Sequence, residues 1–178
     1  LREQRIPYYL SGGLSFFERT EVRDIMAYLK LLANPDNDSA FLRVVNTPRR
    51  EIGAATLEKL SAYAQGRSLS LFAASFELGL AQHLNDRQLA SLKRFCVWLS
   101  DLADRAKEEE PGTVLRSLLS DIAYDAWLKE TCDSLEAAEK RMENVLELTG
   151  WLTRLAKQNQ EDESSTFAEL VARLSLIG

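Results

Sequence analysis

From Asp38 to the end of the chain, apolar residues recur at three- and four-residue spacing, which places them on one face of a helix. The two longest such segments are residues 86–107 and the segment that begins at Ser134. Shorter helices are expected at about 41–45, after Gly53, near 71–76, after Thr113, at 124–127 and after Thr166. This pattern predicts a mainly α fold, an irregular helical bundle.

Residues that commonly cap helices mark several of these boundaries. Asn85 with Gln88, and Thr166 with Glu169, have the spacing of a capping box. Single capping residues are expected at the other boundaries: Thr20, Ser68 or Ser70, Thr113 and Ser134.

The first residues follow a different pattern. Residues 6–10 are apolar enough for a short strand, residues 11–13 would end it in a turn, and a helix should follow from about Thr20. Strand, glycine turn and helix in this order are typical of α/β structure. The turn-forming residues 34–38 then interrupt the chain. We therefore predict an α/β fragment at residues 1–33 and a helical domain at residues 34–178.

The net charge of −5 argues against a surface that binds nucleic acid all over, because duplex binding depends on cations placed against phosphates. The charge is unevenly distributed, however. Between residues 43 and 67 five cations face only two acids, Glu51 and Glu58. Any contact with DNA is therefore expected to be local and to involve this window.

The sequence contains no pattern that predicts catalysis. It has no GxxxxGK[ST] loop, no GxGxxG fingerprint and no GxSxG elbow. The single histidine, His83, has no metal-like partners, and we interpret Cys96 and Cys132 as buried thiols. We expect no catalytic residue, no metal site and no ATP hydrolysis by this chain. No apolar run approaches the roughly 20 residues that span a bilayer, so we expect no membrane partner and a cytoplasmic location.

Residues 46–60 predict a helix-hairpin-helix layout, in which one helix ends, Pro48 makes a tight connection and Gly53 leads into the next helix. A helix start offers unpaired backbone N–H groups and partial positive charge, and a DNA phosphate can bind there. The alternative is that Gly53 merely turns the chain and the arginines are solvated. The candidate DNA-binding residues are Thr47, Arg49, Arg50, Ile52, Gly53, Thr56 and Lys59.

Several runs in this region resemble one family. Residues 12–24 read GGLSFFERTEVRD and are followed by AYL at 27–29 and NPD at 34–36. The match continues through FLRVVNTPR at 41–49 and IGAATL at 52–57. These runs resemble the Rep, UvrD and PcrA group of superfamily-one DNA helicases. Glu51 stands where the usual UvrD or PcrA reading has glycine, which resembles the Rep branch more closely.

The resemblance implies an internal piece of an ATP-dependent 3′-to-5′ helicase acting in replication or repair. Residues 1–33 would belong to its RecA-like 2A domain and residues 34–178 to its accessory 2B subdomain. Asn34, Pro35 and Asp36 would form a hinge about which 2B swivels to gate unwinding. ATP and Mg²⁺ would bind elsewhere in the parent helicase, and this piece would need no cofactor.

The resemblance also implies the partners. Duplex DNA at a single-strand/duplex junction and the rest of the helicase chain come first. A second protomer or a replication or repair protein is a further option. The alternative function is a protein-interaction module, which the acidic bias outside the hairpin favours. Glu51 next to the phosphate position is expected to weaken DNA contact.

Overall fold

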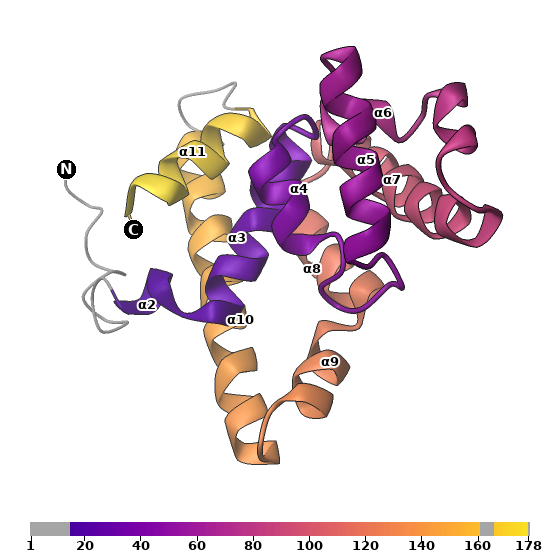
Figure 1. The fold of residues 1–178 in the computed structure, drawn as a ribbon. Helices are drawn as coiled ribbons and strands as arrows, with labels where there is room; N and C mark the ends of the chain where they lie inside the picture. The colour runs from indigo at the N-terminus through magenta and orange to yellow at the C-terminus, as the bar shows by residue number, and fades with distance from the viewer. Residues whose placement is uncertain (1–14, 161–165, 178) are drawn as a thin grey trace.

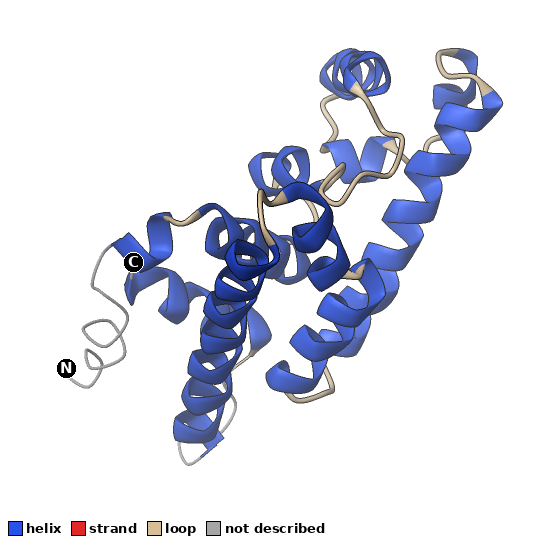
Figure 2. Ribbon diagram, turned by 90° about the horizontal axis from the view of Figure 1, so that it is seen from below, coloured by secondary structure: helices blue, strands red, loops and turns tan. Residues whose placement is uncertain are grey.

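The computed structural model describes residues 15–160 and 166–177, and within these ranges it consists of helices and connecting loops (Figures 1 and 2). The mainly helical prediction is confirmed. The strand predicted at residues 6–10 and the turn at 11–13 lie outside the described residues. In chain order the helices are α2 (Ser15–Glu18), α3 (Thr20–Ala33), α4 (Asp38–Val44), α5 (Ala54–Arg67), α6 (Leu71–Ala74), the 3₁₀ helix η1 (Leu78–Gln82), α7 (Asp86–Ala106), α8 (Pro111–Ile122), α9 (Tyr124–Thr131), α10 (Leu135–Gln160) and α11 (Phe167–Ile177).

Helix α3 lies at the centre of the bundle and packs against α4, α7, α10 and α11 (Figure 1). Val22, Ile25, Tyr28 and Leu29 on this helix are fully buried. The segment before residue 34 therefore shares a hydrophobic core with the helices that follow it.

The two long helices form the framework on which the shorter ones pack. Helix α7 is amphipathic, and Leu92, Cys96 and Leu99 on its inner face are fully buried. Helix α10 packs against α3, α8, α9 and α11 and meets α9 at one tip of the molecule (Figure 1). Cys96 is buried as predicted, whereas Cys132 is only half-buried.

Hydrogen bonds show which capping predictions hold. The Asn85/Gln88 and Thr166/Glu169 capping boxes are both formed, and Ser134 and Ser70 accept from the helices that they precede. Thr20 and Thr113 do not cap their helices. Both helices begin earlier than expected, so the N-cap residue is Arg19 in α3 and Glu110 in α8. Neither side chain makes a capping hydrogen bond. Pro111 explains the start of α8, since a proline at the first helical position sacrifices no hydrogen bond.

Two of the three acidic residues of the GGLSFFERTEVRD run, Glu21 and Asp24, are buried, whereas Glu18 is exposed. Asp24 is 7% exposed; it pairs with Arg43 at 3.1 Å and accepts a hydrogen bond from the Tyr124 hydroxyl at 3.1 Å. Burial raises the pKa of Asp24, an effect that Arg43 and Tyr124 partly oppose. Burial also raises the pKa of Tyr124, as does the neighbouring Asp24 carboxylate. Asp24 thus links α3 to α4 and α9.

Glu21, one turn earlier on α3, makes the matching link to α10. Its side chain is 3% exposed and accepts a hydrogen bond from Asn144 Nδ2 at 2.8 Å. Arg141 lies at 4.0 Å from the same carboxylate. Glu21 and Asp24 therefore both have a structural role, which follows from the rule that buried charges must be paired.

Candidate nucleic-acid interface

The loop between α4 and α5 is a hairpin whose shape is fixed by one side chain. Asn46 Oδ1 accepts from the backbone N–H of Arg50 at 2.6 Å and of Ile52 at 3.3 Å. Ile52 is fully buried and anchors the hairpin in the core. The Thr47–Pro48 peptide bond in this loop is cis. The Asn46 hydrogen bonds and the buried Ile52 therefore hold the hairpin in place, and the first turn of α5 is exposed to solvent.

Arg50 points into the molecule. Its guanidinium donates to the carbonyl oxygens of Val44 at 2.8 Å and Val45 at 3.1 Å. It also lies 4.6 Å from the centre of the Phe95 ring. Arg50 therefore satisfies the carbonyls at the end of α4 and joins the hairpin to α7, a structural role that sequence reasoning did not separate from DNA contact.

Tyr28 completes this arrangement from α3. Its hydroxyl accepts from the Arg50 guanidinium at 2.6 Å and donates to the Thr47 carbonyl. Burial raises the pKa of Tyr28 to about 12, despite the neighbouring Arg50 cation, so the phenol stays protonated and able to donate. Thr47 thus contributes its carbonyl to the interior, and its side chain is half-buried.

The candidate residues divide into two groups. Those on the outside are Arg49, Gly53 and Lys59, all exposed. Those turned inward are Arg50, Ile52 and Thr56, the last only 3% exposed. The structure therefore brings Arg49, Gly53 and Lys59 to a surface where a large ligand can reach them, while Ile52 and Thr56 face the core.

The first turn of α5 has the features that an anion requires. Gly53 is the N-cap residue, and no side chain caps this end of the helix. A Cβ added at Gly53 would meet nothing within 4 Å, and Gly53, Ala54 and Ala55 are exposed, so the first turn of the helix adjoins open space. The first intrahelical bond here runs from Leu57 N–H to the Gly53 carbonyl at 3.1 Å. The earlier N–H groups and the positive end of the helix dipole face this open space.

Glu51 occupies a backbone position that favours glycine. Its φ is 64°, in the left-handed region that costs a residue with a Cβ about 1 kcal/mol. Its carboxylate pairs with Arg87 on α7 at 3.2 Å, and both side chains are largely exposed. A glycine at this position would adopt the same backbone conformation without that cost. Glu51 places a negative charge at the hairpin that Arg87 partly neutralises.

Sequence reasoning missed three residues that shape this site. Asn46 and Tyr28 hold the hairpin by hydrogen bonds on its buried side. Trp127 on α9 lies with its ring centre 5.9 Å from the Arg49 guanidinium, which steadies the exposed arginine. Asn46 and Tyr28 both lie in the family-like runs, which was the available signal, whereas nothing in the sequence linked Trp127 to a residue 78 positions earlier.

The turn predicted as a hinge is held by hydrogen bonds. Asp36 N–H donates to Asn34 Oδ1 at 3.1 Å, and the Asp36 carboxylate accepts from the Ser70 hydroxyl at 2.6 Å. The turn is therefore tied to the start of α6. Hinge motion at Asn34, Pro35 and Asp36 stays a prediction.

Within residues 15–160 and 166–177, no group of three or more His, Cys, Asp or Glu side chains gathers where it could hold a metal ion. None of the helices in these ranges combines the length and apolar character needed to cross a bilayer.

Comparison with protein families identifies the class to which this helical bundle belongs. Residues 1–177 match the UvrD-like helicase C-terminal domain. The chain belongs to this family.

Individual relatives refine the comparison. The chain is 51% identical over 176 residues to the ATP-dependent DNA helicase Rep of Salmonella typhimurium and 48% identical over 176 residues to that of Escherichia coli K12. Each alignment covers 99% of this chain and 26% of the relative. DNA helicase II of Escherichia coli K12 is 37% identical over 166 residues, which is 92% of this chain and 22% of that protein. The chain thus spans about a quarter of the length of the Rep relatives.

Proposed function

We propose that this chain is the accessory 2B subdomain, with an adjoining piece of 2A, of an ATP-dependent 3′-to-5′ DNA helicase. Its task is to contact duplex DNA next to a single-strand/duplex junction through the hairpin and the start of α5. The observation that carries the proposal is the open, uncapped N-terminus of α5 beside two exposed cations, Arg49 and Lys59, in a chain of net negative charge.

The hairpin suits a backbone phosphate. Backbone N–H groups at the start of α5 can donate to phosphate oxygens, and Arg49 and Lys59 supply flanking positive charge. Such contacts fix the position of a protein on DNA and read no sequence. Since the chain has no phosphate-binding loop of the NTPase kind, ATP and Mg²⁺ belong to the rest of the helicase.

The proposal includes a swivel at Asn34, Pro35 and Asp36 that brings the hairpin to the duplex or withdraws it. A rotation at this turn must separate α3 from α4, α7, α10 and α11, with which it shares a core, and must break the Asp24–Arg43 ion pair. It can therefore be blocked. Lys30 on α3 and Ser39 on α4 line the same cavity. In the whole helicase, Lys30→Cys/Ser39→Cys joined by a short thiol cross-linker should abolish unwinding and spare ATP hydrolysis. Full unwinding by the cross-linked enzyme would place the swivel elsewhere.

The DNA contact is tested by fluorescence anisotropy of a labelled duplex with a single-stranded tail, across a range of salt concentrations. Arg49→Gln/Lys59→Gln should weaken binding and reduce the salt slope by about two, one for each lost phosphate contact. Arg116→Gln/Arg154→Gln is the matched control, because it removes the same charge from exposed positions on α8 and α10. Equal losses in both variants would leave only a general charge effect and refute a contact at the hairpin.

A second candidate, docking of a partner protein, is favoured by one observation. Leu78 and Phe76, beside η1, are 88% and 42% exposed, which is unusual for large apolar side chains that lie close together in the sequence. Binding through such a surface would persist at high salt, whereas phosphate binding would not.

A further inference from the structure

A cleft of about 380 Å³ lies between the hairpin, the middle of α7 and the end of α8. The cleft adjoins the proposed duplex contact, because Arg49 belongs to both. The rest of its lining comes mainly from α7 and the end of α8. Its volume is within the range of pockets that hold small ligands, of the order of one nucleotide.

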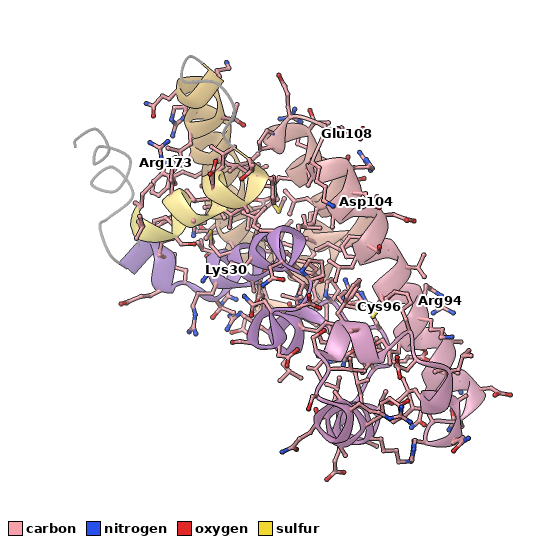
Figure 3. All side chains as sticks on the ribbon, turned by 90° about the horizontal axis from the view of Figure 1, so that it is seen from above. Lys30, Arg94, Cys96, Asp104, Glu108 and Arg173 are labelled. Carbon is pink, nitrogen blue, oxygen red and sulfur yellow. The ribbon has the colours of Figure 1, made fainter. Side chains whose placement is uncertain are left out.

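Positive charge predominates in the cleft. Arg94 on α7 lines it, is exposed, and has no ion-pair partner among the residues that the structure describes. Figure 3 shows Arg94 on the outer side of α7, while Cys96 faces the bundle. Asp121 is the acid in the lining, and its carboxylate accepts a hydrogen bond from Trp98 Nε1 at 2.8 Å. Arg49 and Arg94 therefore offer two guanidinium groups to an anion.

Ser91 gives an independent indication of a ligand. This side chain lines the cleft and is only 6% exposed, yet its hydroxyl makes no hydrogen bond to any described residue. Buried hydroxyl groups in native proteins are normally paired, and an unpaired one has lost its hydrogen bonds to water without replacement. A ligand oxygen in the cleft would satisfy it.

The floor of the cleft is aromatic. Phe95 and Trp98 line it, with ring centres 5.9 Å apart. The bond from Trp98 Nε1 to Asp121 fixes the indole ring, so that its plane is oriented before any ligand arrives. Fixed aromatic rings beside arginines are the combination with which proteins hold unpaired bases and their phosphates.

We propose that this cleft binds one nucleotide of an unpaired DNA strand, with its phosphate against Arg49 and Arg94 and its base against the half-buried Trp98 ring. Phe95 is 2% exposed and lies under the Arg50 guanidinium, so it packs beside Trp98 and does not contact the base. This inference rests on the proposed function, because it assumes that the hairpin is already near a junction. The duplex and the unpaired strand would then occupy adjacent sites on either side of Arg49. An acidic peptide would satisfy the arginines but would leave the aromatic floor without a planar partner.

The test is a titration of the isotope-labelled chain with pentathymidylate, followed by ¹H–¹⁵N spectra, with the Trp98 indole signal assigned through Trp98→Phe. Pentathymidylate should shift the Trp98 indole signal and the Ser91 and Arg94 amide signals. Arg94→Gln should weaken this binding about five- to tenfold and Ser91→Ala about threefold, while Arg116→Gln leaves it unchanged. Because its hydroxyl is unpaired, Ser91→Ala should not lower the melting temperature of the unsubstituted chain.

A blunt duplex separates this inference from the proposed function. Lys59→Gln should weaken duplex binding and spare pentathymidylate, and Arg94→Gln should do the reverse. Duplex binding without any pentathymidylate shift would overturn the cleft and leave the hairpin proposal standing. Equal shifts with inorganic phosphate or penta-aspartate would also overturn it, because the cleft would then be a general anion site or a peptide site. Failure of both DNA probes with a folded chain would refute both proposals.

Discussion

Arg49 and Arg50 are neighbours in sequence, yet the structure assigns them opposite roles, which can be tested by alanine substitution. Arg50→Ala removes two hydrogen bonds to carbonyl oxygens, one to Tyr28 and a cation–π contact with Phe95. Hydrogen bonds to charged groups contribute about 1.5–3 kcal/mol each, and new solvation of the freed carbonyls offsets part of this loss. We expect Arg50→Ala to lower the free energy of unfolding by about 3–5 kcal/mol.

Thermal and urea unfolding followed by circular dichroism give the measurement. For a chain of this length a loss of 3–5 kcal/mol corresponds to a fall in melting temperature of about 10 °C or more. Arg49→Ala removes an exposed side chain and should change stability by no more than about 0.5 kcal/mol, while weakening duplex binding. Equal melting temperatures for the two variants would refute the inward assignment of Arg50. A double substitution would confound folding with binding, so the two arginines must be changed separately.

Three further predictions follow from the hairpin and the buried acids. Glu51→Gly should raise the free energy of unfolding by about 0.5 kcal/mol, because relief of the left-handed backbone strain outweighs the loss of an exposed ion pair with Arg87. The same substitution removes a carboxylate from the hairpin and should tighten duplex binding; weaker binding in anisotropy would contradict this. Asn46→Ala should lower the free energy of unfolding by about 1–3 kcal/mol, since the N–H groups of Arg50 and Ile52 lose their acceptor, and an unchanged urea midpoint would contradict it. Because burial raises the folded pKa of Asp24, its contribution to stability is full below the pKa of the unfolded chain and is lost as pH rises through the folded value. The stability of the unsubstituted chain relative to Asp24→Asn should therefore fall as pH rises above the ordinary aspartate pKa of 3.8, and a rise in urea titrations would refute the sign.

The helices were predictable because local signals decide them. The apolar period of α7 and its Asn85/Gln88 capping box act within one or two turns, so they are visible in the sequence. The errors at Thr20 and Thr113 have the same local origin, since two residues that favour capping lie one to three positions inside helices that begin earlier. The left-handed conformation of Glu51 breaks a local preference and is visible only in the structure.

The candidate site was predictable as a segment and not as a set of contacts. Composition and spacing predicted the hairpin at residues 46–60, and phosphate binding there stays a prediction. Which arginine faces outward depends on Tyr28 and Phe95, which come from distant parts of the chain. The same holds for Glu21 and Asp24. Their partners on α4, α9 and α10 arrive only when the bundle forms.

The central claim is that a duplex phosphate sits at the start of α5, and the backbone amide signals of residues 54–56 report on it most directly. Titration of the isotope-labelled chain with a blunt duplex should move these signals downfield, as expected for new N–H hydrogen bonds to phosphate, and added salt should reverse the change. Unchanged amide signals at 54–56, with shifts elsewhere in a folded chain that binds the duplex, would place the DNA contact on another surface and contradict the account.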